Sequence, residues 1–390
     1  MSEAFIYSAC RTPIGRFRRA LSSLTATDLG AIVVREALAR TDLRPEDIDE
    51  VILGNVLTAG TGQAPARQAA LRGGLPVAVA ALTVNKVCGS GLKAVMLAAQ
   101  AVRCGDAQWI VAGGMESMSQ ACWVLPRESP ALGNQTLVDS MLHDGLTCAF
   151  SHRSMGDIAE QLAERTGISR ADQDRFALES HRRAVAAIDA GAFTTEIVPV
   201  SCGADKPEVK QDEGPRGDTD WDRLANLAPV FREQGTVTAG NSSMISDGAA
   251  ALVVGSEATL SQTSQRPLAR IVASATSGTE PDNLFLAPVE AIRQVVAKAG
   301  LSLADINLFE INEAFAVQML TCIRQLGLPL DRVNVHGGAI AFGHPIGASG
   351  ARVLVTLLHA LELRNGRFGV AALCLGGGNA VAMLVEREKQ

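Results

Sequence analysis

The chain has 390 residues, too many for one ordinary hydrophobic core, so its length predicts two or three lobes. Hydrophobic residues make up 47% and charged residues 19%, as in globular proteins. The net charge of −6 argues against nucleic acid as the main partner, because neutralising phosphates needs a basic face. No apolar run reaches the roughly 18–20 residues of a membrane helix, and the N-terminus has no signal-peptide core, so we expect neither a membrane span nor export.

The cysteines and histidines carry no sign of a disulfide framework or a metal site. None of the cysteines forms a CxxC pair, and the six histidines show no ligand spacing. A reducing cytoplasm is therefore the expected location, with no bound metal. The eight cysteines stand at positions 10, 88, 104, 122, 148, 202, 322 and 374.

Strands and helices alternate in the first part of the chain. Short apolar runs predict strands over 3–9, 50–55, 81–87 and 109–117. Amphipathic or small-residue segments predict helices over 27–41, 63–74 and directly after Cys88. This alternation indicates a parallel or mixed sheet with helices on its faces.

The composition changes near residue 120. From there to about 248, charged and turn residues increase, and amphipathic helices dominate. The segment 205–223 is highly charged and is predicted to be a surface loop. We interpret this region as an insertion on one lobe.

The alternation returns from about residue 270, with predicted strands over 270–277, 306–311 and 333–338 and helices over 287–300, 314–327 and 349–363. A closing hairpin is predicted over 368–387. Both parts of the chain carry a Val-Asn pair, a glycine-rich turn and then a small-residue helix. An internal duplication is the simplest account.

Cys88 lies in the sequence VNKVCGSGLKA, between an apolar strand and a nearly all-apolar helix. The N–H groups and the dipole of a helix N-terminus favour a thiolate. The flanking glycines would let a substrate reach the sulfur. The alternative is a small core cysteine, the usual fate of an intracellular thiol.

The same segment, GSGLKA, also matches the GxGxxA fingerprint of nicotinamide-dependent dehydrogenases. It follows a strand and opens a helix, as that interpretation requires. It lies deep in the chain, however, and a cysteine precedes its first glycine. No acidic residue clearly ends the next strand at the expected distance, although Glu116 is near.

Three further residues lie in unusual surroundings. His344 is in GHPIGASG, where Pro345 fixes the backbone, although a structural histidine is the alternative. Cys374 ends an apolar strand and meets three glycines, whose N–H groups could receive an oxyanion. Asn312 joins a strand to a helix, where it could cap that helix or hold a water.

Together these segments resemble the thiolase family. The motifs that carry the resemblance follow in order through nearly the whole chain, and chance agreement of all of them is negligible. They are RTPIG at 11–15, GQAPARQAA at 62–70, NKVCGSG at 85–91, GGMESMS at 113–119, TAGNSS and SDGAA within 238–250, NEAFA at 312–316, GHPIGASGAR at 343–352 and CLGGG at 374–378.

The resemblance implies an α/β fold of two duplicated βαβαβαββ halves, stacked as a five-layered α-β-α-β-α sandwich. Residues 1–120 plus 249–268 would form the N-terminal half, and residues 269–390 the C-terminal half. Residues 121–248 would form a loop domain that covers coenzyme A. The family forms dimers, commonly paired into tetramers.

The resemblance also implies an acyltransferase that acts on acyl-CoA and 3-oxoacyl-CoA, with coenzyme A as a substrate and no permanently bound cofactor. Cys88 would be the acylated nucleophile, His344 its base, and Cys374 the acid and base at the α-carbon. Asn312 would position a water beside the enolate oxygen, and the N–H groups of Cys88 and Gly376 would form a second oxyanion site. A ketoacyl-synthase-like condensing enzyme shares the fold, but Cys374 in a CxGGG setting opposes it.

Eight positions match coenzyme A contacts of the family: Leu146, Arg216, Leu227, Phe231, Ala239, Ser243, Ala314 and Phe315. The chain also departs from the family pattern. Ser154 stands where histidine is common, His336 where asparagine is usual, and Arg18 and Arg19 where small residues follow Phe17. The loop 284–291 has lost both family glycines, one to Phe285. Acyl preference and the physiological direction therefore stay unpredicted.

Overall fold

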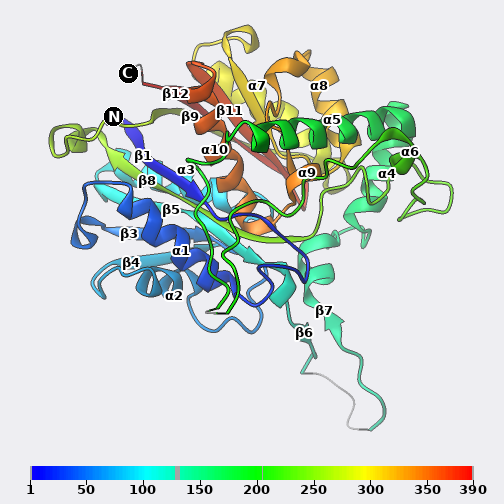
Figure 1. Cartoon of the computed structure of the whole chain (residues 1–390), viewed down its shortest axis with the longest axis horizontal. Coiled ribbons are helices and arrows are strands. Elements are labelled where there is room, and N and C mark those ends of the chain that lie inside the picture. The colour runs from blue at the N-terminus through cyan, green and yellow to red at the C-terminus, as the bar shows by residue number, and fades with distance from the viewer. Residues whose placement is uncertain (1, 128–131, 204, 389–390) are drawn as a thin grey trace.

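The computed structural model describes residues 2–127, 132–203 and 205–388. Across these residues the main feature is a ten-stranded mixed sheet in the order β10-β11-β12-β9-β1-β8-β5-β3-β4, with β2 paired to β8. Figure 1 shows this sheet running from the C-terminal strands at the top to β4 at the lower left. A separate two-stranded ribbon joins β6 to β7.

The first half follows the predicted alternation. Strands β3, β4 and β5 pair in parallel, and β8 returns antiparallel between β5 and β1. Helix α1 begins where the sequence predicts, because Thr25 and Asp28 form a capping box. The elements are β1 (Ala4–Arg11), β2 (Gly15–Arg16), α1 (Ala26–Ala39), β3 (Glu50–Gly54), α2 (Pro65–Arg72), β4 (Ala80–Val84), α3 (Ser90–Cys104), β5 (Trp109–Ser117) and β8 (Ser246–Ser256).

The second half repeats this order with one strand missing. Its elements are β9 (Ala269–Gly278), α7 (Ala287–Lys298), β10 (Leu308–Ile311), α8 (Ala316–Leu326), α9 (Ala339–Phe342), α10 (Ile346–Leu363), β11 (Phe368–Leu375) and β12 (Asn379–Arg387). The strand predicted over 333–338 was wrong, since only Val333 bridges to Phe309. The Asn334 side chain bonds both the N–H and the C=O of Ile311, at 2.9 and 2.8 Å. This side chain takes the place of the backbone ladder.

Helices α3 and α10 form the middle layer of the molecule. Both pack against strands of the two halves, while α1 and α2 cover one outer face and α7 and α8 the other (Figure 1). The predicted five-layered α-β-α-β-α arrangement is therefore confirmed. Gly91 and Gly350 lie where the two central helices touch, and a Cβ on either would collide with the other helix's backbone. Helix α10 is long and apolar enough to span a membrane, but 89% of it is buried in this core.

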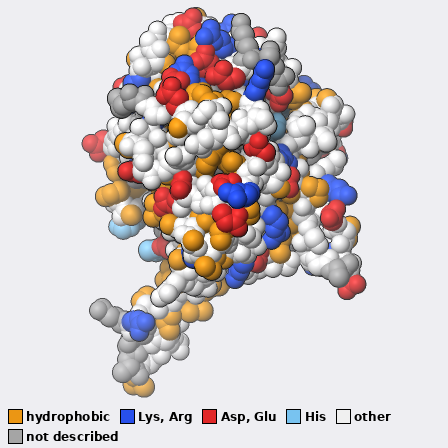
Figure 2. Space-filling model, turned by 90° about the vertical axis from the view of Figure 1, so that its left-hand side faces the viewer, with side chains coloured by type: hydrophobic (Ala, Val, Ile, Leu, Met, Phe, Trp, Pro, Cys, Tyr) orange, Lys and Arg blue, Asp and Glu red, His pale blue; other side chains and the backbone are white. Residues whose placement is uncertain are grey.

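The segment between β5 and β8 lies over the second half. Helices α4 (Met155–Thr166) and α5 (Arg170–Asp189) pack on α8, and α5 also packs on α9 and on α6 (Trp221–Ala225). The buried Arg11 side chain holds this segment to β1 through Glu196 and Asp212, at 2.5 and 2.7 Å. The ribbon of β6 (Trp123–Val124) and β7 (Val138–Asp139) projects away from the body (Figures 1 and 2).

Candidate active site

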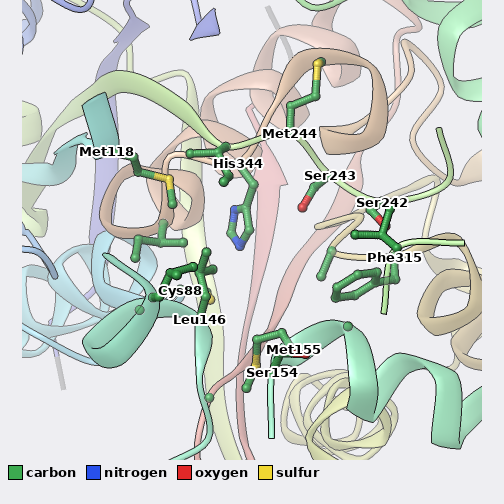
Figure 3. Close-up of a pocket in the computed structure, with 18 of the residues that line it drawn as sticks. Cys88, Met118, Leu146, Ser154, Met155, Ser242, Ser243, Met244, Phe315 and His344 are labelled. Carbon is green, nitrogen blue, oxygen red and sulfur yellow. The ribbon is translucent and has the colours of Figure 1, made fainter. Parts of the chain in front are cut away.

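A cavity of about 710 Å³ lies between the covering helices and the ends of the central strands. Its wall includes Cys88, His344, Cys374 and Gly376, four of the predicted catalytic residues. In Figure 3 the His344 ring points into this cavity above Cys88. Its size suits a small-molecule ligand. Residues more than 250 positions apart in the sequence thus meet around one space.

The turn before α3 presents the Cys88 thiol. Val87 adopts φ +48°, and the Ser90 hydroxyl accepts from Lys86 N at 2.8 Å and donates to Val87 O at 2.6 Å. The backbone N–H groups of Gly376 and of Cys88 itself point at the sulfur. Burial outweighs them and raises the pKa of Cys88 to about 11. At neutral pH Cys88 is therefore a neutral thiol in the unliganded protein, although the helix N-terminus by itself favours a thiolate.

His344 is a neutral, oriented imidazole. It follows Gly343, whose φ of +114° favours glycine, and its N–H donates to Met244 O at 2.9 Å. The Ser349 hydroxyl donates to Pro345 O at 2.9 Å, so it accepts from His344 Nδ1 at 2.5 Å. This places the ring proton on Nδ1 and leaves Nε2 as a free base. Burial, then the charge of Arg352, lowers the pKa of His344 to about 3.

Asn312 lies beside the histidine and does not cap a helix, because α8 begins only at Ala316 with Phe315 as its cap residue. Its Nδ2 is 3.4 Å from both ring nitrogens of His344, so it donates squarely to neither. Its Oδ1 is buried without a hydrogen-bond partner among the described residues. Such an amide is available to a water or to a substrate oxygen.

Cys374 lies at the end of β11 and is almost fully buried. Burial raises the pKa of its thiol well above the ordinary value, and the neighbouring Cys88 and Cys322 raise it further. The dependence on Cys88 means that the two sulfurs lie close together. The following Gly377 and Gly378 adopt φ of +80° and +82°, so the glycine run is needed to turn the chain past the cavity.

Glu116, at the end of β5, holds two other segments behind the cavity. Its buried carboxylate accepts from Asn55 Nδ2 at 2.7 Å, Val56 N at 3.1 Å, Leu57 N at 3.2 Å and Gly347 N at 2.9 Å. Gly347 lies in the first turn of α10, three residues after His344. Burial raises the pKa of Glu116 to about 7, against the lowering effect of its four donors. The sequence by itself marks Glu116 only as the acidic residue near the dinucleotide fingerprint.

Six of the eight predicted coenzyme A positions line the cavity: Leu146, Phe231, Ala239, Ser243, Ala314 and Phe315. The other two, Arg216 and Leu227, lie outside the cavity wall. The N–H of Arg216 donates to Nδ1 of the buried His181 at 3.2 Å. The rings of Phe231 and Phe285 each pack edge-on against Phe315, with centroids 6.3 and 5.4 Å apart. Two arginines in the wall, Arg16 and Arg19, were not predicted there.

The positions that depart from the family pattern fall into two groups. Ser154 caps α4 through Asp157 N, and Leu284 and Phe285 lie in the cavity wall. His336 instead packs edge-on against Phe193, with ring centroids 5.8 Å apart. Replacement of the family glycine by Phe285 therefore changes the cavity itself, beside Cys374 in the same apolar cluster.

Two other interpretations do not fit this geometry. A pyrophosphate cannot approach GSGLKA, because Gly91 packs directly against the backbone of α10. Within the described residues, no three His, Cys, Asp or Glu side chains gather as metal ligands would. The fold and the site define a class of duplicated α/β proteins in which two cysteines and a histidine from the two halves converge on one cavity.

Comparison with known proteins identifies the family of this chain. Residues 4–258 match the family of the thiolase N-terminal domain and residues 265–387 that of the thiolase C-terminal domain, so the chain belongs to the thiolase family. It is 51% identical to acetyl-CoA acetyltransferases of Pseudomonas aeruginosa and Escherichia coli, with at least 99% of each chain covered.

Solved structures show the same likeness. The acetyl-CoA acetyltransferase of Bacillus anthracis superposes with a TM-score of 0.97 at 40% identity, covering 100% of this chain and 99% of that one. A thiolase from Ascaris suum in complex with coenzyme A superposes with a TM-score of 0.94 at 42% identity, covering 99% and 100%.

Proposed function

We propose that the protein transfers acyl groups between CoA thioesters through an acyl-Cys88 intermediate, as an acetyl-CoA acetyltransferase does. The single observation that carries this proposal is the convergence of Cys88, His344 and Cys374 on one cavity. The acetyl-CoA acetyltransferases to which the chain is about half identical support it.

In the cleavage direction, His344 Nε2 takes the proton of Cys88 as the sulfur attacks the 3-oxo carbonyl. A neutral thiol and a neutral base make this transfer concerted with attack, because neither group is ionised beforehand. The N–H groups of Cys88 and Gly376, which point at the sulfur, would receive the developing oxyanion. When the C2–C3 bond breaks, the electron pair passes into the enolate of acetyl-CoA.

Cys374 would give its proton to C2 of that enolate, releasing acetyl-CoA and leaving an acyl group on Cys88. A water held by Asn312, together with His344, would stabilise the enolate oxygen. The free Oδ1 of Asn312 and its position beside the imidazole support this role. Free coenzyme A then attacks the acyl-enzyme and loses its thiol proton to Cys374, and the Cys88 sulfur regains the proton held by His344. Condensation is the same sequence in reverse.

The pantetheine arm of coenzyme A would lie along Leu146, Phe231, Ala239, Ser243, Ala314 and Phe315, which line the cavity. Arg216 and Leu227, outside that wall, would contact the nucleotide end. The crystal structure of the Ascaris suum thiolase in complex with coenzyme A supports the class of ligand. Residues 121–248 would act as the covering domain, with 1–120 plus 249–268 and 269–390 as the two halves.

Assembly as a dimer, with dimers paired into tetramers, is part of the proposal. β4 is an edge strand, and Leu82 on it is half-exposed, so a second copy could extend the sheet. The projecting β6–β7 ribbon carries exposed apolar side chains, visible as orange patches in Figure 2. These include Trp123, Leu125 and Leu137. All eight cysteines are free, which supports a reducing cytoplasmic location.

The test is mass spectrometry after brief incubation with acetyl-CoA. We expect an acetyl adduct on Cys88 that is absent from Cys88→Ala. A wild-type protein without any adduct, or an adduct that persists in Cys88→Ala, would overturn the proposal. Steady-state thiolysis of acetoacetyl-CoA then measures turnover independently of the adduct.

A further inference from the structure

The end of β2 and the loop after it contribute two arginines to the wall of the catalytic cavity, the half-buried Arg16 and the exposed Arg19. Arg16 and Arg19 line the same wall as Cys88 and His344. Within residues 2–127, 132–203 and 205–388, neither guanidinium has an ion-pair or hydrogen-bond partner. A cation that faces a cavity without a counter-charge is a candidate anion site.

The backbone of this loop is fixed even though the two side chains are free. Glu213 Oε2 accepts from Arg16 N at 2.9 Å and from Ala20 N at 3.1 Å. Arg18 N donates to Ser119 Oγ at 2.8 Å. Arg18 adopts φ +57° and its guanidinium lies 5.4 Å from the Phe17 ring, outside the cavity wall. The loop thus directs two of its three arginines to the cavity.

The position of these arginines indicates which part of a substrate they would meet. Phe17, between them, packs in an apolar cluster with Leu57, Met118, Ile346 and Cys88. The aromatic positions assigned to pantetheine belong to a different cluster, with Cys374. Figure 3 shows Met118 and Phe315 on opposite sides of His344. Leu146, one of the positions assigned to pantetheine, packs in the Phe17 cluster as well. The arginines therefore lie on the nucleophile's side of the cavity, away from the aromatic part of the proposed coenzyme A channel.

We propose that Arg16 and Arg19 bind a carboxylate at the far end of the acyl chain, so the enzyme accepts 3-oxoacyl-CoA substrates that end in a carboxylate. The inference rests on the proposed thiolase reaction and adds the substrate class. A guanidinium matches a carboxylate with two parallel hydrogen bonds. In a partly buried cavity, losing such charged bonds reduces specificity by about 10–100-fold.

The test compares two substrates of equal length, 3-oxoadipyl-CoA and 3-oxohexanoyl-CoA, which differ by a terminal carboxylate in place of a methyl group. We expect the wild type to prefer 3-oxoadipyl-CoA at least 10-fold in kcat/KM for thiolysis. We also expect this preference to shrink as ionic strength rises, because salt screens the charge attraction. A wild type that prefers the neutral substrate would overturn the inference.

Substitutions of the arginines test whether these side chains cause the preference for the terminal carboxylate. Arg16→Gln/Arg19→Gln should lose the preference for the carboxylate and leave kcat/KM for 3-oxohexanoyl-CoA within about 3-fold, since that chain has no charge to bind. Arg18→Gln is the matched control: it removes the same charge from the same loop, outside the cavity wall. It should behave as the wild type.

The kinetics of the double variant show whether the arginines bind the terminal carboxylate or the coenzyme A phosphates. If the double variant raises KM for coenzyme A and for both acyl substrates equally, the arginines bind coenzyme A phosphates and the inference fails. It also fails if Arg18→Gln matches the double variant. Thiolysis of acetoacetyl-CoA, which has no terminal carboxylate, tests the thiolase function alone. Its absence in the wild type would overturn that function rather than the inference.

Discussion

The turns before α3 and α10 are built from similar sequences and hold their reactive side chains differently. The first passes from Asn85 to Cys88 in a few residues and leaves the thiol half-buried, facing two N–H groups. The second inserts α9 between Asn334 and His344 and buries the imidazole against Ser349. The difference teaches that one duplicated scaffold can supply an accessible nucleophile and an oriented base.

The largest expected effect tests this division of roles. Cys88→Ala should abolish the acyl-enzyme, since the other sulfur in the described cavity wall, Cys374, is assigned to the α-carbon rather than to the acyl group. His344→Ala should lower kcat/KM for thiolysis by about 10³–10⁴-fold, because the thiol loses its base. The sulfur itself remains in His344→Ala, so slow alkylation of Cys88 by iodoacetamide should persist. Loss of alkylation in that variant would mean that the two turns are not independent.

A smaller effect separates the two sulfurs. Cys374→Ala should still form the acetyl-Cys88 adduct and lose about 10²–10⁴-fold in carbon–carbon cleavage, because the enolate has no proton donor. Adduct mass and thiolysis rate, measured on the same sample, check both halves of this expectation. Full turnover in the variant would remove Cys374 from the mechanism.

Glu116 joins the loop after β3 to the first turn of α10, and Glu116→Gln should lower kcat by roughly 10–100-fold, because an amide can accept fewer of the four hydrogen bonds. KM for coenzyme A should change little. Glu160→Gln is the matched control, since Glu160 is a buried carboxylate that accepts from Thr236 N and Val237 N in the covering segment. Both variants should lower the melting temperature. Equal losses of kcat in the two would show that Glu116 only stabilises the fold.

Ser349 orients the imidazole of His344 in the turn before α10. Ser349→Ala removes the acceptor of His344 Nδ1–H, and we expect about a 10-fold loss of kcat as the wrong tautomer becomes populated. The acyl-enzyme should still form, more slowly. Ser349→Thr keeps the hydroxyl and should recover most of the rate if the methyl group fits. Unchanged kinetics in Ser349→Ala would show that another group orients the ring.

The smallest effect concerns stability in alkali. Burial raises the pKa of Cys10 and Cys322 to about 12 and that of Cys88 to about 11, from an ordinary value of 9.0. Their stabilising contribution is complete below pH 9 and is lost as pH rises, because the unfolded chain ionises first. Between pH 9 and its raised pKa, each thiol should lower the free energy of unfolding by about 1.4 kcal/mol per pH unit. Denaturant titrations at pH 8–11 give the free energy of unfolding at each pH. This free energy should fall less steeply with pH in Cys322→Ala than in the wild type, and as steeply as in the wild type in Cys104→Ala.

Local sequence signals predicted most elements, because capping residues and apolar periodicity act within a few residues. Thr25 with Asp28 set the start of α1, and the apolar run before Cys374 became β11. The prediction of a strand over 333–338 was wrong because the side chain of Asn334 replaces backbone pairing with Ile311. Arg16 and Arg19 were not predicted as site residues. The unusual Arg18-Arg19 pair after Phe17 is the sequence feature that indicates them.

The sequence by itself determined the thiolase family, the order of strands and helices, and the identity of the two sulfurs and the imidazole, since motifs and periodicity are written in consecutive residues. Only the tertiary structure decided how those groups are protonated. Burial keeps Cys88 a thiol and His344 a neutral base, against the thiolate that a helix N-terminus alone would favour. Desolvation depends on every segment packed around a group, and no local stretch of chain contains that information.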